Sequence, residues 1–402
     1  MPLPLDGIRV ADFCWLGAGA YTTKMLADMG ADVIKIESST HIDSLRITAP
    51  FADKIPGVNR SGYFADRNSS KRSITINVKK PEGREVIAAL IAVSDVVSNN
   101  FAPGAMERMG FSYDAVRKIK DDIIYLSMSY QGATGPDRAT LGYGLTIGAL
   151  SGLHYLTGLP EREPSGTGTH YPDHIPNPCH AAFSVMAALR HRRRTGQGQE
   201  IDLSQMESST ALVAPAIMAA DANGDRVEAV GNRAPSAAPR GVYPCEGEDC
   251  FISIAIESNA QWEALVDLLG LPIRSDWATL RGRVADHDAI DALVADKTAK
   301  LDRYALMADL QAIGVCCGVV QTAADVVERD PQLRHREHWI ELPHKEVGSM
   351  IYNALPFRFV SQRLGPRFGA PLLGEHNEAV LHDLLGKSRE EIEALAAKGV
   401  LE

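Results

Sequence analysis

The sequence contains few cysteines and no long apolar segment. Its six cysteines form no C-x-x-C pair and show no spacing typical of a zinc site, so we expect reduced thiols rather than a redox or zinc motif. No apolar run reaches the roughly 18 residues that a membrane-spanning helix requires. The first residues, MPLPLDGIRVADF, lack the charged and apolar regions of a signal peptide. We therefore expect a cytoplasmic protein with no membrane partner.

The chain also lacks an excess of positive charge. Its formal net charge is −10 at pH 7, so no broad basic face is available for nucleic acid. A local basic pocket for one nucleotide-bearing cofactor remains compatible with that charge. With 45% apolar and 23% charged residues, the composition is that of a soluble globular protein. A length of 402 residues predicts two packed units.

The N-terminal region has the pattern of a β-α-β unit. Apolar strands are expected at 8–13 and 31–37, with a tight turn at residues 15–19 and a helix at 21–29 between them. Units of this kind form parallel sheets. Gly17 and Gly19 would also suit a dinucleotide site with Glu37 on the ribose, but Thr22 occupies the third glycine position of that fingerprint.

The stretch 170–207 places an aspartate before a helix of small residues. Asn177 and Pro178 form a helix start, and Thr195-Gly196 ends the helix after a run of arginines. Asp173 is therefore expected in a proline-bounded loop near the N-terminal amides of that helix, which would keep its carboxylate ionised. An aspartate in this position is more often part of a turn than a catalytic group.

The order of features around Asp173 resembles the family III CoA-transferases, the formyl-CoA and carnitine CoA-transferase (CaiB/BaiF-like) group. The matching features are Asp173, Ala187-Ala188-Leu189, Arg192 to Arg194, the T-G-Q-G-Q segment at 195–199, Ile201 to Leu203 and Glu207. The resemblance implies an α/β fold with a large Rossmann-like parallel-sheet domain built from both ends of the chain, a smaller α/β domain, and an interlocked, ring-like homodimer. It also implies that Asp173 is the nucleophile.

The same resemblance implies where coenzyme A binds. The implied coenzyme A contacts are Gly17, Ala18, Ser38, Ile76, Asn77, Val78, Lys79, Asn100, Phe101, Ala102, Arg108, Ser129, Tyr130, Gln131 and Gly132. The stretch Ile76–Lys79 is expected to be a strand beside the adenine. Lys71, Arg72 and Lys79 could serve phosphates, with a solvated turn as the alternative.

The chain departs from the family pattern in three places. Gly17 stands where the family has a glutamine, Ala102 where it often has an arginine, and Ser236-Ala237-Ala238 where it often has a run of glycines that closes over the site. A lid without glycine would be stiffer. Trp15 and Tyr143 are candidates for lining the acyl pocket, and ordinary core packing is the alternative for both.

The expected reaction moves coenzyme A from an acyl-CoA to a small carboxylic acid through an anhydride and a thioester on Asp173. A racemase is the first alternative, although Gly142-Tyr143-Gly144 lacks the His-Asp pair that the α-methylacyl-CoA racemases carry there. A supporting subunit of a heteromeric transferase is the second. The histidines at 170, 174 and 180 match no zinc spacing, so no metal is expected.

The expected boundaries follow from the same patterns. Residues 1–215, completed by a returning segment 331–402, should form the large domain that binds coenzyme A and carries the nucleophile. A polar, glycine-containing stretch at 216–230 reads as a linker. Residues 231–330, with two strands around the acidic turn at 246–249 and three helices, should form the smaller domain.

Overall fold

The computed structural model describes residues 2–402 and divides them into two compact units. The larger unit comprises residues up to Tyr155, Gly166–Val227 and Gln332–Glu402, and the smaller comprises Leu156–Ser165 and Glu228–Pro331. The chain therefore leaves the larger unit twice. The first excursion, residues 156–165, was assigned to the large domain in the sequence analysis and instead packs with the smaller unit.

A six-stranded parallel sheet is the framework of the larger unit within residues 2–402. The strands lie in the order β3-β2-β1-β4-β5-β6, which is the order of doubly wound nucleotide-binding folds. In the register, Val10 pairs with both Val33 and Val96. The strands are β1 Arg9–Asp12, β2 Asp32–Glu37, β3 Lys71–Thr75, β4 Val96–Asn99, β5 Ile124–Ser127 and β6 Gln199–Asp202.

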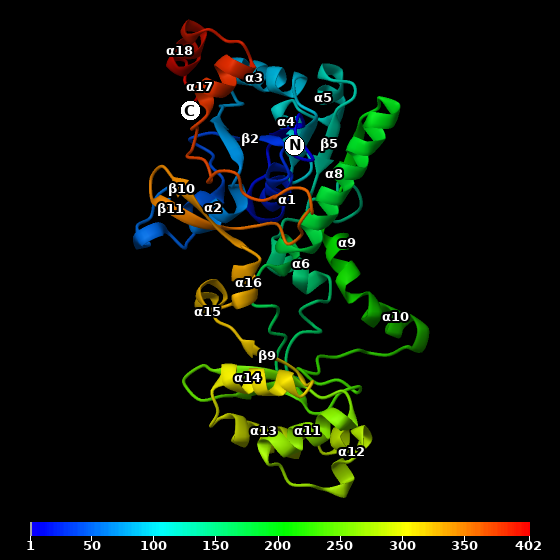
Figure 1. Cartoon of the computed structure of the whole chain (residues 1–402). Helices are drawn as coiled ribbons and strands as arrows, with labels where there is room; N and C mark the ends of the chain where they lie inside the picture. The colour runs from blue at the N-terminus through cyan, green and yellow to red at the C-terminus, as the bar shows by residue number, and fades with distance from the viewer. Residues whose placement is uncertain (1) are drawn as a thin grey trace. The chain divides into compact units, whose positions relative to one another are not determined.

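Helices cover both faces of this sheet (Figure 1). The helices of the larger unit before its C-terminal segment are α1 Leu16–Asp28, α2 Gly62–Asn68, α3 Pro81–Ala92, α4 Ala105–Met109, α5 Tyr113–Ile119, α6 Gly144–Leu150, α7 Tyr171–His174, α8 Pro176–Thr195, α9 Gln205–Thr210 and α10 Ala214–Asn223. Short 3-10 turns are η1 Ser44–Ile47, η2 Ala52–Lys54 and η3 Ala211–Val213. Among residues 2–402, no helix combines the length and apolarity needed to cross a membrane.

Alternation along the strands separates two apolar cores. Val10, Val33 and Val96 point into one core with α1 and α8, and Ala11, Ile34 and Val97 point into the other with α3. Successive side chains of a strand face opposite sides, so a continuous apolar run such as Val96-Val97 serves both cores. The sheet is thus buried on each face, and its strand ends are the places left for a site.

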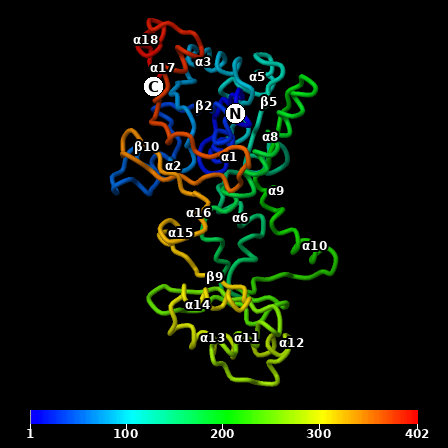
Figure 2. Tube along the Cα trace, in the orientation of Figure 1, coloured from blue at the N-terminus to red at the C-terminus, as the bar shows by residue number. Residues whose placement is uncertain are grey.

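The C-terminal segment returns to the larger unit. It contains α16 Pro331–His335, the hairpin β10 Trp339–His344 and β11 Gly348–Asn353, then α17 Asn377–Ala379, the π-helical turn η5 Val380–Leu384 and α18 Arg389–Ala397. Figure 2 traces this segment from orange to red as it passes α2 and reaches α3. Val380 and Leu381 join the core beside α3, and the Asn77 N–H donates to the carbonyl of Val400. This tail therefore closes one face of the sheet.

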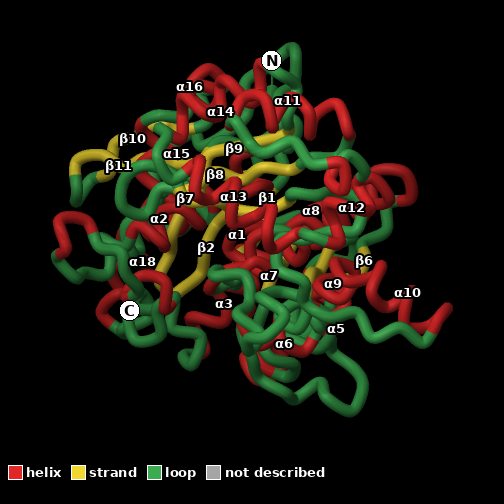
Figure 3. The backbone as a smooth tube through the Cα atoms, turned by 90° about the horizontal axis from the view of Figure 1, so that it is seen from below, coloured by secondary structure: helices red, strands yellow, loops and turns green. Residues whose placement is uncertain are grey.

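The smaller unit is a three-stranded antiparallel sheet packed with helices. Figure 3 shows its strands in yellow, and the order is β7-β8-β9. Its elements are β7 Arg240–Pro244, β8 Phe251–Ala255, α11 Asn259–Leu269, η4 Ser275–Trp277, α12 Leu280–Ala285, α13 His287–Thr298, α14 Arg303–Ala312, β9 Cys316–Val320 and α15 Ala323–Glu328. Its own apolar core includes Ile252, Ile254, Trp262 and Trp277.

Four local expectations are wrong. Residues 16–19 are the first turn of α1 rather than a tight turn, and β3 ends at Thr75, so 76–79 follow the strand. α8 begins at Pro176, one residue before Asn177, which is therefore inside the helix and does not cap it. The expected linker at 216–230 is helical up to Asn223. In each case a helix extends further or a strand ends earlier than residue propensity indicates, because tertiary packing decides element ends.

Candidate active site

The Asp173 side chain lies in a one-turn helix, α7, and not in an irregular loop. α7 packs against α1, α6 and α8. The carboxylate accepts a hydrogen bond from the backbone N–H of Gly144, the first residue of α6. A Cβ atom added to Gly144 would lie 2.6 Å from Asp173 Oδ2, and one added to Gly17 would lie 2.9 Å from the same atom. Glycine at both positions therefore lets two backbones close on one carboxylate.

The pKa of Asp173 also differs from the sequence-based expectation. Burial raises its pKa to about 6, against the opposing influence of His170, the Gly144 N–H and Arg67. The helix-terminus argument predicted a carboxylate kept ionised by its surroundings. Desolvation instead outweighs the nearby dipoles and charges. At pH 7 the group is still mostly ionised, but its pKa lies within the working range of a nucleophile or base.

A small cavity of about 100 Å³ opens onto Asp173. It is bounded by the starts of α1 and α6, by the loop after β4 and by the loop after β5. The lining residues are Leu16, Gly17, Ala18, Asn100, Ala102, Pro103, Tyr130, Thr140, Leu141, Gly142, Tyr143, Asp173 and Gln205. The cavity therefore collects Gly17, Ala18, Asn100, Ala102, Tyr130, Tyr143 and Asp173 from the residues singled out in the sequence.

The backbone at the start of α1 is held by buried polar groups. Leu16 has a φ of 59°, a left-handed conformation that a leucine rarely adopts and that neighbouring contacts must stabilise. The Leu16 N–H donates to Asp43 Oδ1 at 3.1 Å. Asn100 brackets the preceding residue, since it accepts from the Trp15 N–H at 2.8 Å and donates to the Trp15 carbonyl at 2.6 Å. These contacts place Gly17 against Asp173.

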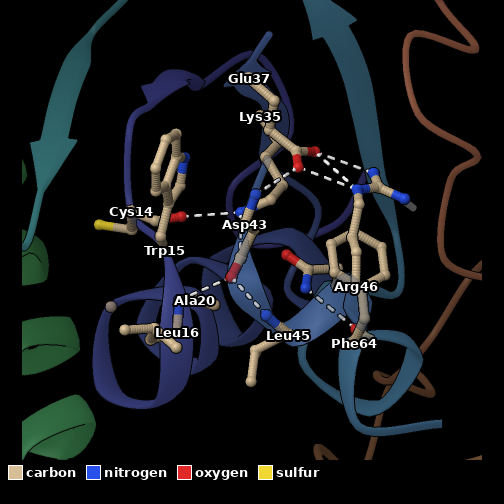
Figure 4. Close-up of polar contacts among 12 residues, drawn as sticks. Cys14, Trp15, Leu16, Ala20, Lys35, Glu37, Asp43, Leu45, Arg46 and Phe64 are labelled. Carbon is tan, nitrogen blue, oxygen red and sulfur yellow. Dashed lines mark hydrogen bonds and ion pairs between the residues drawn. The ribbon is translucent and has the colours of Figure 1, made fainter. Parts of the chain in front are cut away.

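Figure 4 shows the charge layer behind this turn, which comprises Lys35, Glu37, Asp43 and Arg46. The Lys35 ammonium donates to Asp43 Oδ2 and to the Cys14 carbonyl, each at 2.8 Å. The Arg46 guanidinium pairs with both oxygens of Glu37. All four side chains are fully buried. Because Glu37 is occupied by Arg46, it cannot serve the ribose of a dinucleotide, so that alternative loses its acidic residue.

Sequence reasoning missed Lys35 and Asp43. A lysine in the middle of the apolar strand D-V-I-K-I-E was the available signal, since a buried lysine requires an acidic partner. The sequence gives no indication that Asp43 is this partner. Asp43 also caps η1 by accepting from the Leu45 N–H, so one carboxylate joins a strand, a 3-10 turn and the first turn of α1.

A second, larger cavity of about 560 Å³ lies beside the first. It is lined by Phe13, Trp15, Ile36, Glu37, Ser38, His41, Ile76, Asn77, Val78, Lys79, Phe101, Ala105, Arg108 and Met109. The Trp15 and Phe101 rings meet edge to face, with centroids 5.3 Å apart. Trp15 precedes Leu16, and Phe101 lies between Asn100 and Ala102, so adjacent residues of two loops line the two cavities.

Comparison with known proteins decides the family. The model of CoA-transferase family III matches residues 5–377, which is most of the chain. The chain belongs to CoA-transferase family III. The sequence resemblance to this family and the expectation of a transferase enzyme are therefore confirmed.

Individual family III members match along their whole length. The formyl-CoA:oxalate CoA-transferase of Streptomyces avermitilis is 31% identical over 100% of both chains. The succinate–glutarate CoA-transferase of Agrobacterium fabrum is 31% identical over 95% of this chain and 96% of its own. Among solved structures, a CAIB/BAIF family protein from Brucella suis is 32% identical, covers 96% of this chain and 100% of its own, and has a TM-score of 0.87. The α/β fold is thereby confirmed.

The two cavities contain most of the coenzyme A contacts that the family III resemblance implied. Ser38, Ile76, Asn77, Val78, Lys79, Phe101 and Arg108 line the larger cavity together with Trp15. Ser129 lines a third cavity of about 440 Å³ at the ends of β4, β5 and β6, and its buried hydroxyl has no hydrogen-bond partner. Gln131 and Gly132 are not among the residues that line these three cavities. The residues that the resemblance implied as coenzyme A contacts therefore line these cavities, except for Gln131 and Gly132.

Two basic residues proposed for phosphates have other partners. The Lys71 ammonium is fully buried and donates to Asp12, Thr23 and Asn68. Arg72 pairs with Asp32. Lys71 and Arg72 are the first two residues of β3, and their side chains contact neighbouring parts of the sheet domain. Both therefore stabilise the sheet and are not available to bind the phosphates of a ligand.

The proposed lid segment lies in the smaller unit. Ala237 and Ala238 are buried, and the Ala238 N–H donates to the Ile256 carbonyl while its own carbonyl accepts from Arg283. Ser236 is the exposed member of the segment. Ala237 and Ala238 are thus part of the packing of this unit. Across residues 2–402, no three His, Cys, Asp or Glu side chains gather as a metal site.

Proposed function

We propose that this family III enzyme moves coenzyme A from an acyl-CoA to a small carboxylic acid, with Asp173 as the covalent nucleophile. The observation that carries the proposal is a partly buried carboxylate that faces a cavity, accepts one backbone N–H and has a pKa of about 6. A carboxylate in this state is desolvated enough to be nucleophilic and still ionised at neutral pH. The names of the relatives support the substrate classes, because they include formyl-CoA with oxalate and succinate with glutarate.

The first half of the reaction would transfer the acyl group and then the thiol. A carboxylate oxygen of Asp173 attacks the thioester carbonyl, the C–S bond breaks, and coenzyme A leaves as the thiolate. The product is a mixed anhydride between Asp173 and the acyl group. The thiolate then attacks the Asp173 carbonyl carbon of the anhydride and releases the donor acid, which leaves an aspartyl-CoA thioester. Charge is conserved in both steps, since one anion enters and one leaves.

The second half would run the same chemistry in the other direction. The acceptor carboxylate attacks the aspartyl thioester, displaces the thiolate and forms a new anhydride. The thiolate attacks the carbonyl of the acceptor, which yields the new acyl-CoA and restores the Asp173 carboxylate. Each tetrahedral addition at Asp173 places negative charge on an oxygen of that side chain. The Gly144 N–H, which already donates to this carboxylate, is the donor best placed to stabilise that charge.

The larger cavity is the proposed site for the nucleotide part of coenzyme A. It joins aromatic and apolar walls, including Phe13, Trp15 and Phe101, to Lys79 and Arg108. Such a lining suits an adenine ring and phosphates. The pantetheine arm would then pass Trp15 and Phe101 toward Asp173. Trp15 therefore belongs to the proposed coenzyme site, whereas Tyr143, in the small cavity, is the proposed acyl-pocket residue.

Hydroxylamine trapping tests the proposal directly. The enzyme is incubated with a panel of acyl-CoAs that includes succinyl-CoA and formyl-CoA, treated with hydroxylamine, digested and analysed by mass spectrometry. We expect a hydroxamate at Asp173 and none at Asp43, a buried aspartate with fixed partners. Samples without acyl-CoA provide the baseline. Deuterium uptake at the α-carbon of a 2-methylacyl-CoA, with no modification of Asp173, would contradict the proposal and support a racemase.

We also propose that the enzyme works as a homodimer, as the sequence resemblance implied. Light scattering should then give a mass twice the 43.5 kDa of one chain. A monomer that becomes active only when mixed with a second, different polypeptide would instead support the heteromeric alternative. The chain retains an aspartate at the nucleophile position, which favours the homodimer.

A further inference from the structure

Arg67, a residue that the sequence analysis did not select, lies close to the nucleophile. It occupies the last turn of α2 and is 8% exposed. Its guanidinium carbon lies 4.4 Å from the centroid of the Tyr21 ring and 5.6 Å from that of Tyr63. Its Nη2 is 2.5 Å from Nδ1 of His174, the neighbour of Asp173 in α7. Arg67 therefore connects α2, α1 and α7.

The chemistry of this contact fixes the state of the imidazole. A guanidinium has only donors, so Nδ1 of His174 must accept and cannot carry a proton. The remaining proton of the neutral ring is then on Nε2. Burial and the adjacent Arg67 together lower the pKa of His174 to about 4, in agreement with that assignment. His174 is thus a neutral acceptor over the physiological pH range and carries no proton to donate from Nδ1.

We propose that Arg67 is a positioning residue for the nucleophile: stacked on Tyr21, it holds the neutral His174 imidazole and thereby fixes the turn that carries Asp173. The inference rests on the proposed role of Asp173. α7 is a single turn of four residues, too short to be stable by itself. A hydrogen bond from a charged donor on a separate helix gives this turn a defined orientation.

The same guanidinium acts on Asp173 through its charge. The effect of burial on the Asp173 carboxylate is opposed by His170, by the Gly144 N–H and by the guanidinium of Arg67. The titratable and charged groups on α7 and the elements around it are Tyr21, Lys24 and Asp28 on α1, Tyr63, Asp66 and Arg67 on α2, Tyr143 before α6, His170 before α7, Tyr171, Asp173 and His174 on α7, and Cys179, His180, Arg190, His191, Arg192, Arg193 and Arg194 on α8. Asp66 is itself hydrogen-bonded to Arg67. Removal of Arg67 would therefore favour the protonated form of Asp173.

The orientation effect is tested with a matched pair of variants at His174. Asn can place its carbonyl oxygen where Nδ1 lies and so keep an acceptor for Arg67, whereas Leu cannot. We expect His174→Leu to lower kcat about 10²-fold with little change in KM, as misplacement of a reacting group does. His174→Asn should restore most of that loss. Equal activity of both variants and the native enzyme would overturn the positioning role, and so would equal loss in both.

The charge effect is tested with Arg67→Met and a control, Arg60→Met. Arg60 is also partly buried, with an unpartnered Nε, but pairs with Asp53. The acid limb of kcat/KM should have its midpoint near pH 6, the pKa of Asp173. In Arg67→Met the midpoint should move measurably upward, since the variant loses a cation that favours the ionised form of Asp173, and Arg60→Met should leave it in place. An unmoved limb in Arg67→Met would overturn the inference.

A titration that needs no turnover separates this inference from the proposed function. Carbodiimide couples to protonated carboxyl groups, so the pH dependence of Asp173 labelling, measured by peptide mass spectrometry, reports its protonation. The exposed Asp53 corrects for reagent decay, since its side chain is 74% exposed. If labelling shifts in Arg67→Met while no acyl-CoA ever traps Asp173, the proposed function fails and the effect of Arg67 on Asp173 stands. If trapping succeeds and labelling does not shift, Arg67 has no such effect.

Discussion

Two aspartates, the fully buried Asp43 and the partly buried Asp173, lie against neighbouring residues at the start of α1, and their surroundings are opposite. Asp43 accepts from the Leu16 N–H, from the Leu45 N–H and from the Lys35 ammonium. Burial alone would raise the pKa of Asp43, but these partners hold it below the usual value. Asp173 lies against Gly17, and its pKa is about 6. The Asp43 carboxylate thus has three hydrogen-bond donors, whereas the Asp173 carboxylate has a single N–H donor.

Under the proposed mechanism, this difference in partners separates a structural carboxylate, Asp43, from a reactive one, Asp173. A nucleophile that is bound by a full set of donors and an ion pair loses its basicity and must break those contacts in order to react. Asp43 is of that kind, and its contacts fix the left-handed turn at Leu16. Asp173 has a cavity on one side and a single N–H donor. Asp43, whose hydrogen-bonding capacity is filled, thus fixes the backbone at Leu16. That backbone in turn places Gly17 against Asp173, which has few partners.

Removal of the Asp173 carboxylate should have the largest effect on activity and the opposite effect on stability. We expect Asp173→Asn to lower kcat by about 10⁴-fold or more, since no anhydride can form. The raised pKa of Asp173 means that its ionised form destabilises the fold above pH 6. At pH 8 the variant should therefore gain about 1–3 kcal/mol in the free energy of unfolding, measured with urea.

The pH dependence gives the internal check on that prediction. With a folded-state pKa of about 6 and an unfolded value near 3.9, the native protein binds more protons than the unfolded chain between these values. The contribution of Asp173 to stability therefore falls as pH rises through this window. The advantage of Asp173→Asn should shrink toward pH 4. A variant that is less stable than the native enzyme at pH 8 would contradict the interpretation of Asp173 as an under-partnered acid.

The corresponding change at Asp43 should lower stability instead. Asp43→Asn removes the hydrogen-bonded ion-pair partner of the buried Lys35 ammonium, which costs about 3–5 kcal/mol in the free energy of unfolding. Asp43→Leu with Lys35→Met should recover only part of this loss, because the N–H groups of Leu16 and Leu45 remain without their acceptor. Chemical denaturation of the three proteins measures the difference. An unfolding midpoint of Asp43→Asn equal to the native one would mean that the ion pair contributes no net stability.

The residues that sequence alone could identify are those that carry local patterns. Alternation and apolar runs predicted the strands at 8–13 and 31–37, and S-N-A-Q at 258–261 starts α11 with a capping box. The Asp173 stretch was recognisable because its features follow one another along the chain. Asn100 and Phe101, which the family resemblance implied as coenzyme A contacts, are also adjacent in the chain, and they line the two cavities next to Trp15.

The contacts that set the behaviour of Asp173 are not local. Arg67 and His174 are separated by 107 positions, and Trp15 and Asn100 by 85. No periodicity relates such residues, so only the fold brings them together. The pKa of Asp173 was misjudged for the same reason, because a nearby helix terminus is visible in the sequence and the burial of the side chain is not. The left-handed backbone at Leu16 depends on Asp43 in the same way.

The substitution with the smallest expected effect adds a single methyl group at Gly17, in the first turn of α1, where the backbone faces Asp173. In Gly17→Ala the new Cβ would lie 2.8 Å from Asp173 Cβ, so the carboxylate must move, while the contacts of Asp43 with Leu16 remain. We expect kcat to fall about 10²-fold, with the free energy of unfolding changed by less than about 1 kcal/mol, since alanine favours a helix. Gly318→Ala, where nothing lies within 4 Å of the added Cβ, is the matched control. Equal kcat in Gly17→Ala and the control would mean that Asp173 tolerates displacement, and the close approach of α1 would then have no catalytic role.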